Sequence, residues 1–139
     1  MADIILTNIS KRFGDKSLFR EYSLEIERGD FVAIMGASGS GKITLLNIMG
    51  LLEKPDSGEI SLCGQKKLSF SSSAANKLRR EKISYLFQNY GLIDTETVEG
   101  NIKIATHFKK LGKRDEQQLI AMHLPRLVYR AMSIVRSIH

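Results

Sequence analysis

The stretch that decides the fold reads Gly36-Ala37-Ser38-Gly39-Ser40-Gly41-Lys42-Ile43-Thr44. It follows the phosphate-binding pattern G-x-x-x-x-G-K-[ST], in which glycines let backbone N–H groups surround phosphate and the lysine supplies a positive charge. Gly36, Gly41 and Lys42 are in register, but the position of the Mg²⁺-binding hydroxyl is Ile43, and Thr44 comes one residue later. We call residues 36–44 the P-loop. It predicts a nucleotide site and leaves open what happens to the nucleotide there.

The segments on either side of the P-loop fit the strand–loop–helix context that this motif requires. Before it, Phe31–Met35 is an unbroken apolar run, typical of a strand buried on both faces. After it, apolar residues recur at helical spacing from Lys42 until Glu53-Lys54-Pro55 ends the pattern. These positions are Leu45, Leu46, Ile48, Met49 and Leu52. A structural glycine turn is the alternative, but so many small residues at this junction have no evident packing role.

The rest of the chain predicts a mixture of strands and helices. Strands are expected at Ile4–Ile9, Leu18–Ile26, Glu59–Cys63 and Ile83–Phe87, where short apolar or alternating runs lie between turn signals. Helices are expected at Ala74–Glu81 and from Thr97, which is a good N-cap residue, toward Leu111. The segment Gln88–Thr95 between them is expected to be a loop.

Composition places the chain among ordinary globular proteins. It has 139 residues, of which 42% are hydrophobic and 26% charged, enough for one domain with its own core. Its apolar runs are far shorter than the roughly 20 residues that span a bilayer, and no basic, signal-like segment opens the sequence. The single cysteine, Cys63, excludes an internal disulfide and fits a reducing cytoplasm.

The net charge of +6 is concentrated toward the C-terminus. Residues 107–139 hold seven of the 21 basic residues but only two of the 15 acidic ones. A basic amphipathic helix that contacts a membrane or nucleic acid is one interpretation of this tail. Its apolar positions are Leu124, Val128, Ala131, Val135 and Ile138. A solvated or packing helix, or a chance pattern, is the simpler interpretation.

Several ordered motifs resemble a known family. Together with the P-loop, five segments resemble the ATP-binding subunit of ABC transporters: Lys11–Gly14, Leu24–Ile34, Leu45–Ile48, Pro55–Ile60 and Tyr85–Gln88. The details are most similar to the small subunits that serve lipoprotein, macrolide and bacteriocin exporters. The resemblance implies an α/β fold with a P-loop NTPase-type partial parallel sheet, an antiparallel β subdomain and the start of a helical subdomain. It divides the chain into an ATP-binding core at residues 1–95 and a helical part with the basic tail at 96–139.

The same resemblance implies roles for individual residues. Phe13 would stack on adenine, although by itself it would be taken for a core residue at a strand end. Gln88 would sense metal and nucleotide and face a transmembrane partner, although a glutamine in a loop is usually just solvated. Ile43 would sit beside the phosphates of ATP and weaken Mg²⁺ binding, because an apolar side chain cannot ligate the ion. The residues that would surround the phosphates are Gly36, Ala37, Ser38, Gly39, Ser40, Gly41, Lys42 and Thr44.

The resemblance also implies motifs that this chain lacks. A complete relative continues to an L-S-G-G-Q signature, a strand ending in Asp and Glu, and a switch histidine. Here Gly112 is the only glycine after Gly100, and Glu116 is the last acidic residue. His123 and His139 stand in no comparable context. ATP hydrolysis is therefore not expected, because phosphoryl transfer depends on the positioning and charge stabilisation that those groups supply.

The loss of resemblance after about Leu119 suggests a truncated or frameshifted product of an exporter gene. Without the strands that carry the missing motifs, the chain is expected to be marginally stable, aggregation-prone or dependent on a partner, since unpaired buried backbone groups cost about 1–3 kcal/mol each. The leading hypothesis is a cytoplasmic ATP-binding subunit at the inner face of the cell membrane. Its partners would be a transmembrane permease and a second ATP-binding subunit, with no nucleic acid. The alternative is a non-catalytic module whose basic tail docks a permease, lipid or nucleic acid.

Overall fold

The computed structural model describes residues 2–87, 91–107 and 111–122. Its contacts divide the chain into two units, Met1–Tyr85 and Leu86–His139. Gln88 and the predicted amphipathic tail from Leu124 onward lie outside the described residues. No helix within the described ranges is long and apolar enough to cross a bilayer.

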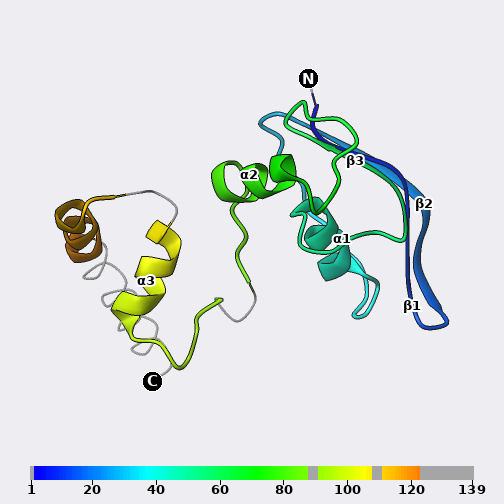
Figure 1. Cartoon of the computed structure of the whole chain (residues 1–139). Helices are drawn as coiled ribbons and strands as arrows, with labels where there is room; N and C mark the ends of the chain where they lie inside the picture. The colour runs from blue at the N-terminus through cyan, green and yellow to red at the C-terminus, as the bar shows by residue number, and fades with distance from the viewer. Residues whose placement is uncertain (1, 88–90, 108–110, 123–139) are drawn as a thin grey trace. The chain divides into compact units, whose positions relative to one another are not determined.

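A three-stranded antiparallel sheet in the order β2-β1-β3 forms the framework of the first unit (Figure 1). β1 covers Ala2–Phe13, β2 covers Lys16–Glu27 and β3 covers Ser57–Leu62. Because side chains alternate with a period of two, the register aligns apolar residues in rows across the sheet. One row is Leu24, Leu6 and Ile60, and the next is Ile26, Ile4 and Leu62. The strands predicted for these three segments and the antiparallel β subdomain are confirmed.

Two helices cover one side of this sheet (Figure 1), α1 at Lys42–Met49 and α2 at Ser73–Glu81. The core between them comprises Leu6, Ile9, Ile60 and Leu62 of the sheet, Leu45, Ile48, Met49 and Leu51 in and after α1, and Ala75 and Leu78 of α2. Both predicted helices are therefore present. α1 ends earlier than the apolar pattern predicted, at the C-cap Gly50, and Leu46 and Leu52 of its predicted apolar face are exposed.

Polar contacts hold the connections of the first unit in place. The Lys11 ammonium donates to the carbonyl oxygen of Lys54 at 2.9 Å and lies 3.2 Å from a carboxylate oxygen of Glu53. The Arg79 guanidinium donates to the carbonyl oxygens of Leu51 at 2.9 Å and Phe70 at 3.1 Å. The Leu51 and Lys54 oxygens follow α1 and the Phe70 oxygen precedes α2, so these bonds fix the chain where it leaves one helix and approaches the next.

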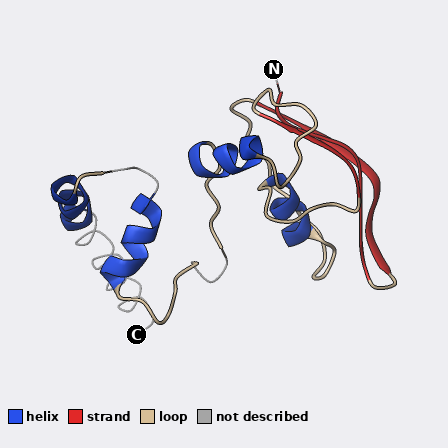
Figure 2. Ribbon diagram, viewed as in Figure 1, coloured by secondary structure: helices blue, strands red, loops and turns tan. Residues whose placement is uncertain are grey.

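Two predicted strands are not formed, and they are the ones assigned to the parallel sheet. Phe31–Met35 and Ile83–Phe87 run as loop segments (Figure 2), and no strand of the described residues pairs with either. Phe31 is 98% exposed and Leu86 is 86% exposed. A buried strand exists only where neighbours take up its backbone hydrogen bonds, and a short apolar run cannot supply them alone. The α/β class stands, but these two strand predictions are wrong for this chain.

The second unit contains helix α3 at Val98–Thr106 and a further helix whose described residues are 113–122. Thr97 caps α3 as predicted, since its hydroxyl oxygen accepts a hydrogen bond from the Gly100 N–H at 3.0 Å. The Thr106 hydroxyl lies 2.8 Å from a carboxylate oxygen of Glu116, which links the two helices. α3 ends at Thr106, short of the predicted end toward Leu111.

Candidate nucleotide-binding site

The P-loop leads directly into an uncapped helix N-terminus. Gly41 is the N-cap of α1 in a left-handed conformation, with φ +94°, and no side chain caps the helix. No acidic residue lies in the first turn of α1. The exposed N–H groups and the positive end of the helix dipole make such a terminus attractive to an anion. The structure therefore places the predicted phosphate-binding residues at a suitable position.

The Lys42 side chain folds back over the loop that precedes it. Its ammonium donates to the carbonyl oxygens of Gly36 at 2.8 Å and Ala37 at 2.7 Å, and lies 3.5 Å from the hydroxyl oxygen of Ser40. Within the loop, a turn forms where the Ser40 N–H donates to the Ala37 carbonyl oxygen at 3.3 Å. The charge that the motif requires is thus held inside the loop, at the beginning of α1.

The start of β2 supports the P-loop from one side. A Cβ at Gly41 would lie 2.9 Å from Phe19 Cζ and 3.4 Å from Leu18 Cδ1, so a larger residue would have to push these side chains aside and would also be strained by the positive φ. The Lys16 ammonium donates to the Gly39 carbonyl oxygen at 3.1 Å. No sequence motif marks Lys16, Leu18 or Phe19 as residues of the site, because their contact with the P-loop depends on how the hairpin folds against it.

Phe13 ends β1 close to this contact. It is 52% exposed and pairs across the hairpin with Lys16, the residue that reaches Gly39. The Lys11 ammonium lies 5.1 Å from the centre of the Phe13 ring, at cation–π distance. The ring is thus exposed at the end of the hairpin that touches the P-loop, rather than buried as a core residue at a strand end.

The residues around Ile43 do not fit a Mg²⁺ site of the usual P-loop kind. Ile43 carries no oxygen and its side chain is 59% exposed. Thr44 does carry a hydroxyl, but the next residue of a helix lies about 100° further around its axis. In the described part of the chain, no group of three or more histidine, cysteine, aspartate or glutamate side chains could hold a metal ion. Any metal would therefore need ligands other than those the motif normally provides.

The segment leading to Gln88 packs against α1, although Gln88 itself lies outside the described residues. The Tyr85 hydroxyl donates to the side-chain oxygen of Asn47 at 2.6 Å. A Cβ on Gly50 would lie 3.2 Å from Tyr85 Cδ2, so the ring sits close to the end of α1. Tyr85, three residues before Gln88, is in this way connected to the helix that follows the P-loop.

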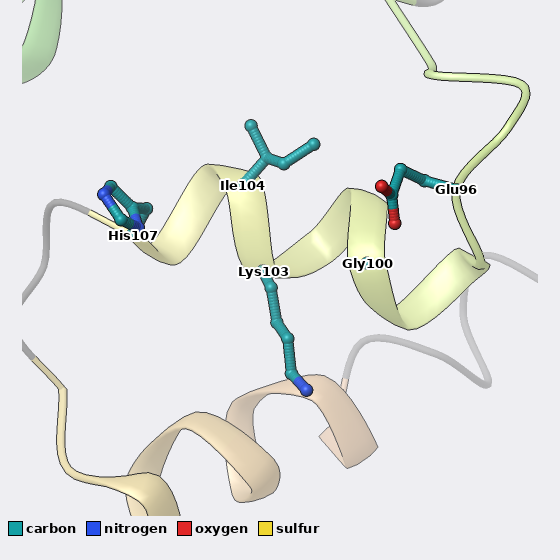
Figure 3. A pocket seen from close by; sticks show the side chains of 5 residues that line it. All are labelled: Glu96, Gly100, Lys103, Ile104 and His107. Carbon is teal, nitrogen blue, oxygen red and sulfur yellow. The ribbon is translucent and has the colours of Figure 1, made fainter.

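A shallow hollow along α3 is a weaker candidate. Five residues line it (Figure 3): Glu96, Gly100, Lys103, Ile104 and His107. In Figure 3 the Lys103 side chain points away from the side of α3 on which Glu96 and Ile104 lie, so the polar groups do not converge on one point. Lys103 is engaged by Glu99, whose carboxylate oxygen lies 2.7 Å away and raises the pKa of Lys103 by hydrogen bonding and charge. This surface shows no arrangement for binding a ligand.

Comparison with known proteins agrees with the motif. Residues 19–136 match the ABC transporter family. The macrolide export ATP-binding/permease protein MacB of Campylobacter jejuni is 39% identical over 115 residues, which are 81% of this chain and 18% of that protein. The bacitracin export ATP-binding protein BceA of Halalkalibacterium halodurans is 35% identical over 118 residues, 82% of this chain and 47% of BceA. The chain therefore spans less than half the length of either relative.

Solved structures show the same likeness. The dimeric structure of MJ0796, a bacterial ABC transporter cassette, has a TM-score of 0.74 and 34% identity, over 88% of this chain and 56% of that one. A second structure of this cassette, in a post-hydrolysis state bound to ADP and Pi, has a TM-score of 0.72 over 83% and 53% of the two chains. Family match, identity and shared architecture lead to one conclusion: the chain belongs to the ABC transporter family.

Proposed function

We propose that this chain binds ATP as the nucleotide-binding part of an ABC-type exporter. The observation that carries the proposal is the Lys42 ammonium, held on the Gly36 and Ala37 carbonyl oxygens at the open N-terminus of α1. Similarity to MJ0796, a cassette solved with ADP and Pi, supports a nucleotide as the ligand. Similarity to macrolide and bacitracin export proteins supports export as the process.

Different residues of this chain would contact the phosphates and the adenine of ATP. Backbone N–H groups of the P-loop and the first turn of α1 would donate to phosphate oxygens, and Lys42 would leave the loop carbonyls to contact them. Phe13 would stack on adenine at the exposed end of the hairpin. Mg²⁺, when bound, neutralises phosphate charge, and Ile43 is expected to reduce that contribution because it offers no ligand.

A binding assay with fluorescent ATP tests the proposal. The parent chain is expected to bind ATP with nearly equal affinity with and without Mg²⁺. In the Ile43→Ser variant, Mg²⁺ is expected to raise the affinity for ATP about tenfold, equivalent to about 1.4 kcal/mol. Ile43→Val is the matched control, since it changes size without adding an oxygen. If neither the parent nor Ile43→Ser binds ATP, the proposed function is wrong.

We further infer that these 139 residues do not hydrolyse ATP on their own. No acidic residue follows Glu116, so the aspartate and glutamate that act on metal and water in complete relatives are absent here. Phosphate release is expected to stay at the background rate at high protein concentration. Turnover that is present in the parent chain and disappears in the Lys42→Ala variant would contradict this inference.

The partners follow from the relatives. The MJ0796 structures are dimeric, and MacB is named as an ATP-binding/permease protein. We therefore propose a second ATP-binding subunit and a transmembrane permease as partners, with Gln88 facing the permease. Such a subunit would work in the cytoplasm at the inner face of the membrane.

A further inference from the structure

The P-loop is contacted by two lysine ammonium groups, and the motif accounts for only one of them. Lys42 reaches the carbonyl oxygens of Gly36 and Ala37 from α1. Lys16 reaches the carbonyl oxygen of Gly39 from the first residue of β2, at 3.1 Å. We propose that Lys16 is a second phosphate-binding residue, which with Lys42 neutralises nucleotide phosphate in place of the missing metal ligand. This proposal rests on the proposed function.

Neither ammonium has a carboxylate partner in the part of the chain that the structure describes. The ion pairs there involve Lys11, Lys67 and Lys103, whereas Lys16 and Lys42 contact only oxygens of the P-loop. Two positive charges therefore converge on one short loop with neutral acceptors alone. A hydrogen bond from an ammonium to a charged oxygen is shorter and stronger than one to a carbonyl. Phosphate oxygens would accordingly displace the loop carbonyls as acceptors.

Lys16 is held near the loop by the hairpin to which it belongs. Its backbone pairs with Phe13, and the neighbouring pair Arg12 and Ser17 continues the ladder. Two and three residues after Lys16, Leu18 and Phe19 lie against Gly41 at the start of α1. The Lys16 side chain is exposed and needs only rotation about its own bonds to turn from the Gly39 carbonyl to a ligand.

Because Ile43 replaces the hydroxyl that helps to bind Mg²⁺, a second lysine beside the P-loop would supply positive charge that the metal otherwise provides. A nucleoside triphosphate carries several negative charges, and a P-loop with a serine or threonine after the lysine uses Mg²⁺ to offset them. Lysine acts at phosphates as a compact point charge and needs no fixed coordination geometry. With two lysines and no hydroxyl at position 43, the site is suited to polyphosphate that is bound with little help from metal. The ligand class is a nucleoside di- or triphosphate, recognised mainly through its phosphates.

The test compares Lys16→Gln with Lys77→Gln, which removes the same charge from an exposed position on α2. Binding of ATP, inorganic tripolyphosphate and adenosine is measured without Mg²⁺ by competition with a fluorescent nucleotide. Lys16→Gln is expected to lower the affinity for ATP and for tripolyphosphate about tenfold, because one charged hydrogen bond to the phosphates is lost. Adenosine should bind as before, and Lys77→Gln should match the parent for all three ligands.

A second variant and the salt dependence separate charge from support of the loop. Lys16→Arg keeps the charge and should retain most of the ATP affinity, and Lys16→Gln should reduce the salt dependence of ATP binding. Equal ATP affinity in Lys16→Gln and Lys77→Gln would overturn the proposal and leave the proposed function intact. Equal losses for ATP and adenosine would also overturn it, because Lys16 would then only support the loop. If the parent chain binds no ATP at all, the proposed function and this inference both fail.

Discussion

Replacing Gly58 with alanine is expected to lower the free energy of unfolding by about 3–5 kcal/mol. Gly58 lies in β3 with φ +97°, and a Cβ there would lie 2.6 Å from the carbonyl oxygen of Asn8 and 2.7 Å from the Cα of Ile9. Thr7 pairs with Glu59 and Ser10 pairs with Ser57, so two residues of β1 stand opposite Gly58. This bulge brings the two backbones together, and backbone atoms cannot move aside as a side chain can.

The loss should be visible in urea unfolding followed by circular dichroism. Typical domains have only about 5–15 kcal/mol of stability, so Gly58→Ala is expected to remove a large share of it and to lower the urea midpoint clearly. Gly64→Ala is the matched control, because Gly64 also has positive φ, +78°, but nothing lies within 4 Å of a Cβ there. Gly64→Ala should lower the free energy of unfolding by about 1–2 kcal/mol, the penalty for the backbone conformation alone. Similar losses in the two variants would show that the close approach at Gly58 is not what matters.

Replacing Lys42 with alanine is expected to weaken ATP binding about 100-fold. The ammonium contacts three oxygens of the P-loop and is the one charged group that the loop itself contributes. Removing it leaves phosphate to the backbone N–H groups and to Lys16. Because the contacts of Lys42 are exposed, the thermal midpoint should change little.

Equilibrium binding of fluorescent ATP measures this effect. The control is Lys54→Ala, which removes an equal charge from an exposed residue whose side chain makes no contact with the P-loop. Lys54→Ala should bind like the parent chain. If Lys42→Ala and Lys54→Ala bind ATP equally well, ATP does not bind at the P-loop, and the proposed function would have to be abandoned.

Local patterns in the sequence predicted the local parts of the fold. The apolar run at Ile4–Ile9 and the partial alternation in Leu18–Ile26 marked β1 and β2, since such runs between turn signals are typical of strands. Thr97 marked the start of α3, because its hydroxyl bonds to an N–H three residues on. The P-loop was found as a motif, and its residues lie in the loop that leads into α1, with Gly41 as the N-cap and Lys42 as the first helical residue.

Contacts between distant segments could not be predicted in this way. The apolar run Phe31–Met35 has the composition of a buried strand, yet Phe31 and Met35 are exposed because no described strand pairs with them. Lys16 is one of 21 basic residues and follows no motif. It reaches the P-loop only because the hairpin turns β2 back along β1 and lays Leu18 and Phe19 on Gly41.

The sequence by itself determined the family, and it predicted the ligand class and a weakened metal site at Ile43, because a phosphate-binding loop depends on residue types at fixed spacing. Only the tertiary structure decided which other residues reach that loop and which apolar segments are buried. Those outcomes depend on hydrogen-bond partners and packing surfaces supplied by residues far away in the chain.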